Sequence, residues 1–137
     1  FCNINPHGQE RIWRVGEYFE EVARTFLPHI SKPWPGSAQL MHLMHLTKSL
    51  RSEYDHYMLQ IHNSMKSNLE YQKDCAQTTF HFPSGSSWIV QSDCVPHAAM
   101  RGQFMLEQTF YLPVSGMANA SLSPLFILER LLGRKLV

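Results

Sequence analysis

The stretch TTFHFPSGSSWIVQSDCVPHAAMRGQFMLEQTFYL (residues 78–112) decides the fold class of this chain. Its period becomes two, which predicts strands at residues 78–82, 86–92 and 103–112. Pro83-Ser84-Gly85 and Arg101-Gly102 separate them with residues typical of turns. This stretch therefore predicts short strands that pair as an antiparallel sheet.

Outward from it, strands are expected at residues 1–5 and 11–15, followed by helices. Phe19, Val22, Ala23, Phe26 and Leu27 share one helical face, and Pro28 ends that helix. After a Pro- and Gly-rich loop at residues 32–36, Ser37 is expected to cap a helix that extends to about Ser49.

Ser52 and Asp55 form a capping-box analogue at the start of a longer helix. Its expected buried stripe contains Tyr54, Met58, Ile61, Met65 and Leu69. Near the carboxyl terminus, Ser123 and Pro124 predict a helix start and Gly133 its stop. Helices within a short-stranded antiparallel sheet predict a mainly β, jelly-roll fold with a helical insert at residues 37–73.

Composition excludes several classes of protein. The chain has 137 residues, 44% apolar and 17% charged, which indicates one globular domain or part of one rather than a disordered chain. A net charge of +1 argues against nucleic-acid binding. No apolar run approaches the roughly 20 residues of a membrane span. Three cysteines without CxxC spacing indicate reduced thiols in a cytosolic protein.

The opening FCNINP looks like a strand already under way, and the chain begins with Phe rather than Met. We therefore expect it to be truncated at its amino terminus. A barrel without its first strands would expose unpaired edges, so this piece alone is expected to be poorly soluble.

His97 is the first candidate for chemistry, because it follows Pro96 at the predicted end of a strand, where the mouth of a barrel holds metal ligands. The alternative is a histidine satisfied by a backbone partner. Gln108 lies on an otherwise apolar strand face and needs a partner, either a backbone group or a polar ligand inside the barrel. Asn3 and Asn5 share a strand face and likewise need polar partners.

Trp13 and Arg14 offer an aromatic wall and a cation suited to a carboxylate; the alternatives are a core residue and a surface ion pair. His42 and His45 form an HxxH pattern without a spaced third ligand, and His56 and His62 do not share a helix face. The sequence contains no phosphate-binding Gly-rich loop, GxSxG or HExxH motif, whereas a Cys–His nucleophile pair stays open.

Four segments resemble the carboxy-terminal half of the Kdo hydroxylases, where Kdo is 3-deoxy-D-manno-octulosonic acid. They are FCNINPHGQERIWRVGE, YDHYMLQIHNSMK, FPSGSSWIVQSDCVPHAAMRGQFMLEQTFYLP and SPLFILERLLGRKLV. The resemblance runs almost end to end and implies a double-stranded β-helix (cupin-like) dioxygenase domain, with residues 1–137 as its carboxy-terminal part. It implies hydroxylation of the Kdo sugar of lipopolysaccharide and lipid A precursors at its 3-position, using iron(II), oxygen and 2-oxoglutarate.

That chemistry requires two histidines and one carboxylate as iron ligands. By resemblance, His97 matches the distal histidine, whereas the His-x-Asp motif of the other two ligands is absent from this sequence. The fragment alone is therefore expected to be inactive. For the far carboxylate of 2-oxoglutarate, Arg14 is the candidate and Arg101 a weaker one; Asn3, Trp13 and Gln108 are expected to line the cosubstrate site.

Two alternatives stay open: a non-catalytic jelly-roll module that binds a sugar or acid, and a 2-oxoglutarate dioxygenase that acts on another substrate, such as a peptidyl side chain. The resemblance places the enzyme in the cytoplasm, at the inner face of the inner membrane, where the helix at residues 125–132 is a candidate peripheral contact. Residues 54–71, with Lys66, are expected to contribute to a pocket for the acidic sugar.

Overall fold

The computed structural model describes residues 1–45 and 49–137, with the side chain of residue 41 excluded. Its strands are β1 (Cys2–Asn3), β2 (Arg11–Gly16), β3 (Gln77–Phe82), β4 (His97–Arg101) and β5 (Met105–Leu106). Its α-helices are α1 (Phe19–Phe26), α2 (Ser37–Leu43), α3 (Glu53–Ser67), α4 (Leu69–Asp74) and α5 (Pro124–Leu132). Short 3₁₀ turns follow at Leu27–His29, Val114–Gly116 and Ala120–Leu122.

The chain forms two compact units. The first, the sheet unit, contains Phe1–Phe19 and Cys75–Ser123; the second, the helical unit, contains Glu20–Asp74 and Pro124–Val137. The helical unit is thus larger than the insert predicted at residues 37–73, because it also takes in most of α1 and all of α5.

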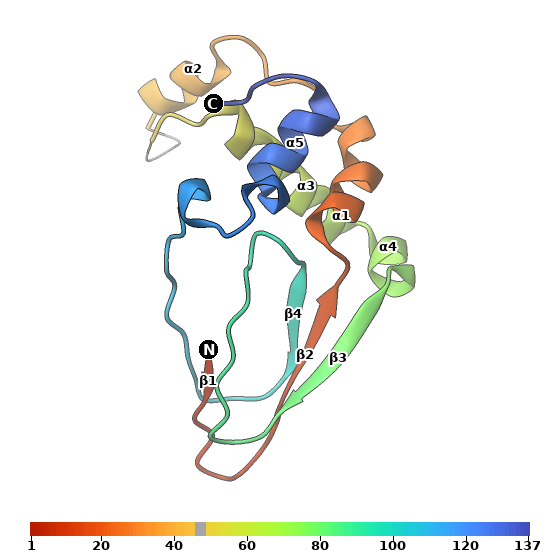
Figure 1. Ribbon diagram of the computed structural model, residues 1–137, viewed down its shortest axis with the longest axis vertical. Helices are drawn as coiled ribbons and strands as arrows, with labels where there is room; N and C mark the ends of the chain where they lie inside the picture. The colour runs from red at the N-terminus through yellow and green to blue at the C-terminus, as the bar shows by residue number, and fades with distance from the viewer. Residues whose placement is uncertain (46–48) are drawn as a thin grey trace. The chain divides into compact units, whose positions relative to one another are not determined.

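In the sheet unit, β2 lies between β3 and β4, and both neighbours run antiparallel to it (Figure 1). β1 and β5 form a separate antiparallel pair. The antiparallel sheets and mixed helices agree with the predicted fold class. The Pro83–Gly85 turn is confirmed, since Gly85 has a φ of 82° and Ser86 N donates to Pro83 O at 3.1 Å.

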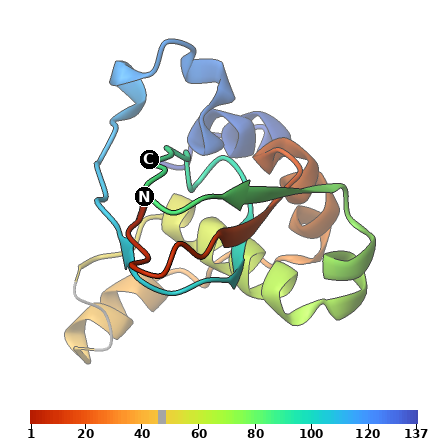
Figure 2. The same cartoon turned by 90° about the horizontal axis from the view of Figure 1, so that it is seen from below.

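Two predicted strands are shorter than expected. In the predicted strand 86–92, only Ser87 forms a bridge, opposite Cys2. In the predicted strand 103–112, only Met105 and Leu106 pair, and the chain beyond them runs as an extended segment apart from the three-stranded sheet (Figures 1 and 2). Alternation marks a backbone suited to a sheet, but a strand also requires a neighbour to pair with.

The amphipathic pattern predicted the first helix of the helical unit well. Val22, Ala23 and Phe26 are buried on α1, and the chain continues as the 3₁₀ helix Leu27–His29, which contains Pro28. The capping box of α3 is confirmed: Ser52 Oγ accepts from Asp55 N at 3.1 Å, and Ser52 N donates to Asp55 Oδ2 at 2.8 Å.

The buried stripe of α3 is only partly as predicted. Ile61 is buried, but its buried partner four residues earlier is Tyr57, which the pattern did not include. Leu69 is 77% exposed because α3 ends at Ser67 and Leu69 begins a new helix. The predicted helix to about Ser49 ends at Leu43 as α2, and residues 46–48 lie outside the described residues.

α5 begins at Pro124 and stops before Gly133, whose φ is 68°, as predicted. Ser123, directly before Pro124, closes the preceding 3₁₀ turn, with its Oγ donating to Ala120 O at 2.7 Å. Ile127 and Leu128 on α5 are buried, so its apolar face packs into the protein. Within the described residues, every helix is too short or too polar to cross a bilayer.

Candidate functional site

His97 begins β4 rather than ending a strand, which corrects the prediction about its position. Its Nδ1 lies 3.1 Å from Val95 O. Because a carbonyl oxygen only accepts, Nδ1 carries the proton in this contact, and Nε2 of the neutral ring keeps a lone pair. Metal-binding histidines in proteins are held this way, with the second nitrogen tied to a carbonyl or carboxylate.

The ring of His97 is also held from the side, by Trp13. The two rings are stacked, with centroids 5.2 Å apart and planes at 8°. The register explains the contact: Val15 lies opposite His97 and Trp13 opposite Ala99, so Trp13 is the diagonal neighbour of His97 on one face of the sheet. We call the face of the sheet that carries Trp13 and His97 the His97 face.

Further aromatic rings surround Trp13 on the His97 face. Phe1 and Trp88 contact Trp13 at centroid distances of 4.7 and 5.3 Å, and Trp88 stacks on Phe82 at 3.9 Å. Trp13 is only 3% exposed. The prediction of an aromatic wall at Trp13 therefore agrees with the structure, and Trp88 is a member of that wall that the sequence did not reveal.

Arg14 lies on the other face of the same strand. It pairs with Ala98, and its Nε lies 3.2 Å from Met100 Sδ. Side chains alternate along a strand, so Arg14 points away from Trp13 and His97. The structure therefore does not bring Arg14 and His97 together on one face of this sheet.

Arg101 is also directed away from the His97 face. A register irregularity between Ile12 and Trp13 places Arg101 opposite Ile12, which belongs to the Arg14 face. An extra residue in a strand re-aims the side chains that follow it. The weaker cation candidate is thus excluded from the His97 face for the same geometric reason as Arg14.

Arg11 is the arginine of β2 that shares the His97 face, since it lies two residues before Trp13 and pairs with Phe82. Its guanidinium donates from Nη1 to Gly102 O at 3.1 Å. The alternation of side chains along a strand could have identified it. Arg11 lies on the same face of β2 as Trp13, whereas Arg14 lies on the opposite face.

Three buried donors on this side of the sheet unit have no hydrogen-bond partner among the described residues. They are Arg11 Nε, Trp13 Nε1 and Trp88 Nε1. Buried polar groups usually have partners, so unpartnered ones mark places where a ligand can bind. All three are donors, and 2-oxoglutarate offers only acceptor atoms. The His97 face therefore fits an iron ligand at one end and an acceptor-rich cosubstrate beside it.

Asn3 and Asn5 have structural partners. Asn3 is fully buried; its Nδ2 donates to Gln9 O and Phe82 O, both at 3.0 Å, and its Oδ1 accepts from Asn5 N at 3.1 Å. Asn5 Oδ1 accepts from His7 N at 2.8 Å. The predicted need for polar partners is confirmed. Both polar side-chain atoms of Asn3 already have protein partners, which does not favour the predicted contact of Asn3 with a cosubstrate.

Gln108 is exposed, in the extended segment beyond β5. Its expected apolar neighbours are exposed as well: Phe110 is 82% exposed and Leu112 56%. The structure therefore does not place Gln108 on a buried face, and it does not bring Gln108 to His97 through any described hydrogen bond.

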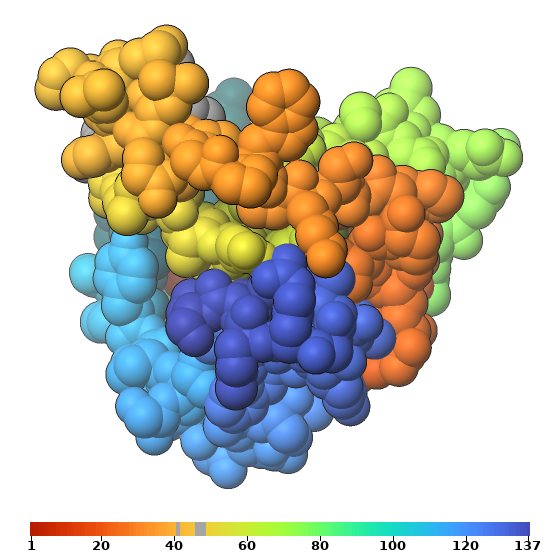
Figure 3. All heavy atoms as spheres, turned by 90° about the horizontal axis from the view of Figure 1, so that it is seen from above, coloured from red at the N-terminus to blue at the C-terminus, as the bar shows by residue number. Residues whose placement is uncertain are grey.

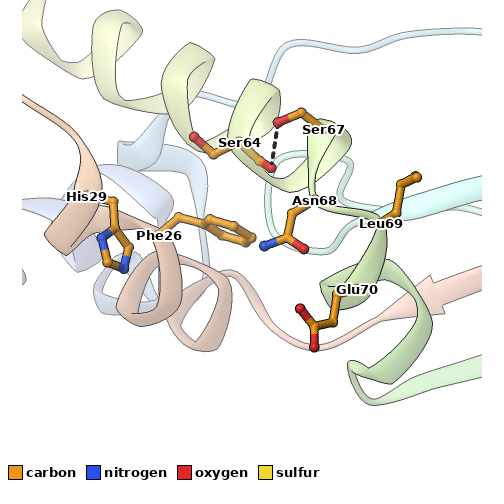
Figure 4. A pocket seen from close by; sticks show the side chains of 7 residues that line it. All are labelled: Phe26, His29, Ser64, Ser67, Asn68, Leu69 and Glu70. Carbon is orange, nitrogen blue, oxygen red and sulfur yellow. Dashed lines mark hydrogen bonds between the residues drawn. The ribbon is translucent and has the colours of Figure 1, made fainter.

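A pocket of about 640 Å³ lies within the helical unit, where an acidic-sugar site was expected. Figure 4 shows its lining residues, which are Phe26, His29, Ser64, Ser67, Asn68, Leu69 and Glu70. Glu70 contributes a carboxylate and Lys66 is not among them. An anionic sugar would meet a like charge there, so this pocket does not support the expected role of residues 54–71.

The remaining metal and nucleophile candidates are not supported. No three His, Cys, Asp or Glu residues gather as a metal site among the residues that the structure describes. Burial, and secondly the charge of Asp93, raises the pKa of the Cys94 thiol. A raised pKa lowers the thiolate fraction near neutral pH, which argues against Cys94 as a nucleophile.

The chain resembles known proteins both in sequence and in structure. The model of the 3-deoxy-D-manno-oct-2-ulosonic acid (Kdo) hydroxylase family matches residues 1–135. The chain also matches crystal structures of the Kdo hydroxylase KdoO, described as a non-heme Fe(II) α-ketoglutarate (2-oxoglutarate) dependent dioxygenase. They include complexes with α-ketoglutarate and Fe(III), with cobalt(II), and with succinate and Fe(III).

Each of these matches has a TM-score of 0.95 and 50% sequence identity. Each covers 99% of this chain but 46% of the KdoO chain, so the sequence spans less than half the length of that relative. No curated protein sequence gives a significant match. With a family model that matches nearly its whole length, the chain belongs to the Kdo hydroxylase family.

Proposed function

We propose that this chain is the part of an iron(II)- and 2-oxoglutarate-dependent hydroxylase that holds the metal through His97 and borders the cosubstrate through the His97 face. The observation that carries the proposal is the ring of His97, with Nδ1 directed to Val95 O and one flank stacked on Trp13. These two contacts fix the tautomer and the orientation, which leaves Nε2 as the metal-binding atom.

The other two iron ligands are proposed to come from outside these 137 residues. The sequence contains no His-x-Asp or His-x-Glu. An iron site of this class takes two histidines and one carboxylate and keeps positions open for 2-oxoglutarate and oxygen. His97 supplies one of the three ligands, and the role of this chain is to orient that ligand and to wall the site.

The bound iron and 2-oxoglutarate supply the oxidising chemistry, in which one oxygen atom enters a substrate C–H bond while 2-oxoglutarate becomes succinate and carbon dioxide. Around them, this chain's residues exclude water and fix orientation. Trp13 and Trp88 give the site an apolar wall with two buried N–H groups, which limits side reactions of the open metal site.

Arg11 takes the place of Arg14 as the proposed cation for the far carboxylate of 2-oxoglutarate. Arg11 is on the His97 face, and its Nε is buried without a partner among the described residues. Arg11 and Val15, the residue opposite His97, are four positions apart on β2, or about 13 Å at the rise of a strand. A dicarboxylate and an extended arginine side chain, placed end to end, would together span such a distance.

The proposed substrate is the Kdo sugar of a lipid A precursor, hydroxylated at its 3-position. Membership of the Kdo hydroxylase family supports this choice. A substrate anchored in the inner membrane would place the enzyme in the cytoplasm, at the membrane surface. The alternatives are a dioxygenase with another acceptor and a module that binds a sugar or an acid without redox chemistry.

A chimera tests the proposal directly. This chain replaces the matching segment of KdoO, so that the remaining part of KdoO supplies the rest of the domain. With Fe(II), 2-oxoglutarate and a Kdo-containing lipid A precursor, the chimera should release succinate and add one oxygen atom to the Kdo residue, measured by mass spectrometry. KdoO itself is the positive control.

Three outcomes are distinguishable. Hydroxylated Kdo supports the full proposal, and succinate release with a different hydroxylated acceptor transfers it to another substrate. A folded chimera that binds Kdo or 2-oxoglutarate but never forms succinate contradicts the catalytic proposal and favours the binding module.

A further inference from the structure

The segment from Lys32 to Arg51 is unusual in charge. No Asp or Glu occurs between Glu21 and Glu53, whereas Arg24, Lys32, Lys48 and Arg51 lie in that interval. The whole chain, by contrast, has 11 acidic residues against 12 basic ones. Lys32 and Arg51 are exposed; Lys48 lies outside the described residues. Every formally charged side chain in residues 22–52 is thus positive.

The same segment exposes large apolar side chains. Trp34 is 82% exposed, Leu43 76%, Leu40 57% and Met44 56%. Leu40, Leu43 and Met44 are three and four positions apart, so they lie on one side of α2 and the turn after it. We call these four residues the α2 patch. Figure 3 shows the gold and orange atoms of this segment at the surface of the molecule.

We propose that the α2 patch is a docking surface for an anionic lipid bilayer. Interfacial membrane-binding segments combine exposed Trp and Leu side chains with flanking Lys or Arg and few acidic residues. Anionic lipid headgroups attract such basic residues, and the apolar side chains enter the boundary between headgroups and acyl chains. Trp prefers that boundary because its ring is apolar and its N–H is polar.

The α2 patch differs from the membrane contact expected from the sequence, which was the helix at residues 125–132. α5 buries Ile127 and Leu128 in the protein, so its apolar face is not free for lipid. The α2 patch is exposed instead, and the exposed Lys32 and Arg51 flank it in the sequence. Exposure and charge carry the argument; the choice of a bilayer over another anionic surface rests on the proposed lipid-anchored substrate.

Vesicle co-sedimentation tests the proposal with the chimera, without iron or 2-oxoglutarate, so its outcome is separate from that of the hydroxylation assay. Vesicles of phosphatidylglycerol and phosphatidylethanolamine are compared with vesicles of phosphatidylcholine. We expect binding to the anionic vesicles that weakens as salt rises. Leu40→Glu with Leu43→Glu should lower the partition coefficient by about tenfold or more.

Leu69→Glu is the matched control, because Leu69 is as exposed as Leu43 and lies outside the α2 patch, on α4. It should leave vesicle binding within about twofold of the unchanged chimera, since it alters charge without touching the proposed surface. Circular dichroism of each variant shows whether the fold is retained.

Tryptophan fluorescence gives a second measurement. Of the three tryptophans of this chain, Trp13 is buried and Trp34 is the most exposed. Anionic vesicles should shift the emission to shorter wavelength, and Trp34→Phe should remove most of that shift. The proposal is overturned if no vesicle binds, if Leu69→Glu weakens binding as much as the α2 variant, or if the α2 variant changes only the self-association of the chain.

Discussion

The two faces of β2 differ in what they hold. On the His97 face, Trp13 is buried and stacked on His97, and Arg11 carries a buried nitrogen without a described partner. On the opposite face, Arg14 lies beside Met100, and His81 contacts Glu10 near the surface. Adjacent residues of one strand thus belong to different environments, and residue type alone does not show which arginine faces the site.

The first prediction compares alanine substitutions of two histidines, one on each face. In the chimera, His97→Ala should lower succinate formation by more than about a hundredfold, because an iron ligand is lost. His81→Ala removes an exposed histidine from the opposite face and should leave turnover nearly unchanged. Iron bound per protein, measured after gel filtration, separates loss of metal from misfolding. Equal turnover of the two variants would contradict the assignment of His97.

The second prediction concerns how tightly side chains pack on the two faces. Trp13→Ala should lower the free energy of unfolding by about 3–5 kcal/mol, because a large buried side chain leaves a cavity. Arg14→Ala, one residue along the strand, should cost less than about 1 kcal/mol, since its side chain is only partly buried. Urea denaturation of both variants in the chimera gives the comparison. Similar losses would show that the two faces are not packed differently.

The third prediction concerns Asn3, whose buried side chain bonds to three backbone groups. Asn3→Ala should destabilise the protein by about 2–3 kcal/mol, because buried backbone groups at Gln9, Phe82 and Asn5 lose their partners. Asn63→Ala, on an exposed position of α3, is the control and should stay within about 0.5 kcal/mol. If Asn3→Ala leaves stability unchanged but weakens 2-oxoglutarate binding, the structural role assigned here is wrong.

The sequence predicted local features better than pairing. The face of α1, the capping box at Ser52 and the turn at Pro83–Gly85 depend on neighbouring residues, and all three agree with the structure. The segment around Gln108 alternates like a strand but pairs only at Met105 and Leu106, because pairing depends on residues far away in sequence.

For the site, the sequence singled out Trp13, which is buried, and Arg14, whereas Arg11 is the arginine of β2 that shares the His97 face. The register of β2 against β4 is needed to decide which residues of β2 share a face with His97. The irregularity between Ile12 and Trp13 also changes the direction of Arg101. No local pattern predicts such an irregularity. Trp88 was missed for a related reason: it reaches Trp13 from a segment that forms no regular strand.

The most direct test of the His97 face compares Arg11→Ala with Arg14→Ala in the chimera, with the KM for 2-oxoglutarate as the readout. Loss of a charged hydrogen bond costs about 1.5–3 kcal/mol, so Arg11→Ala should raise this KM roughly 10- to 100-fold. Arg11→Lys should recover part of it, and Arg14→Ala should leave it within about twofold. A rise in KM with Arg14→Ala and none with Arg11→Ala would contradict the account.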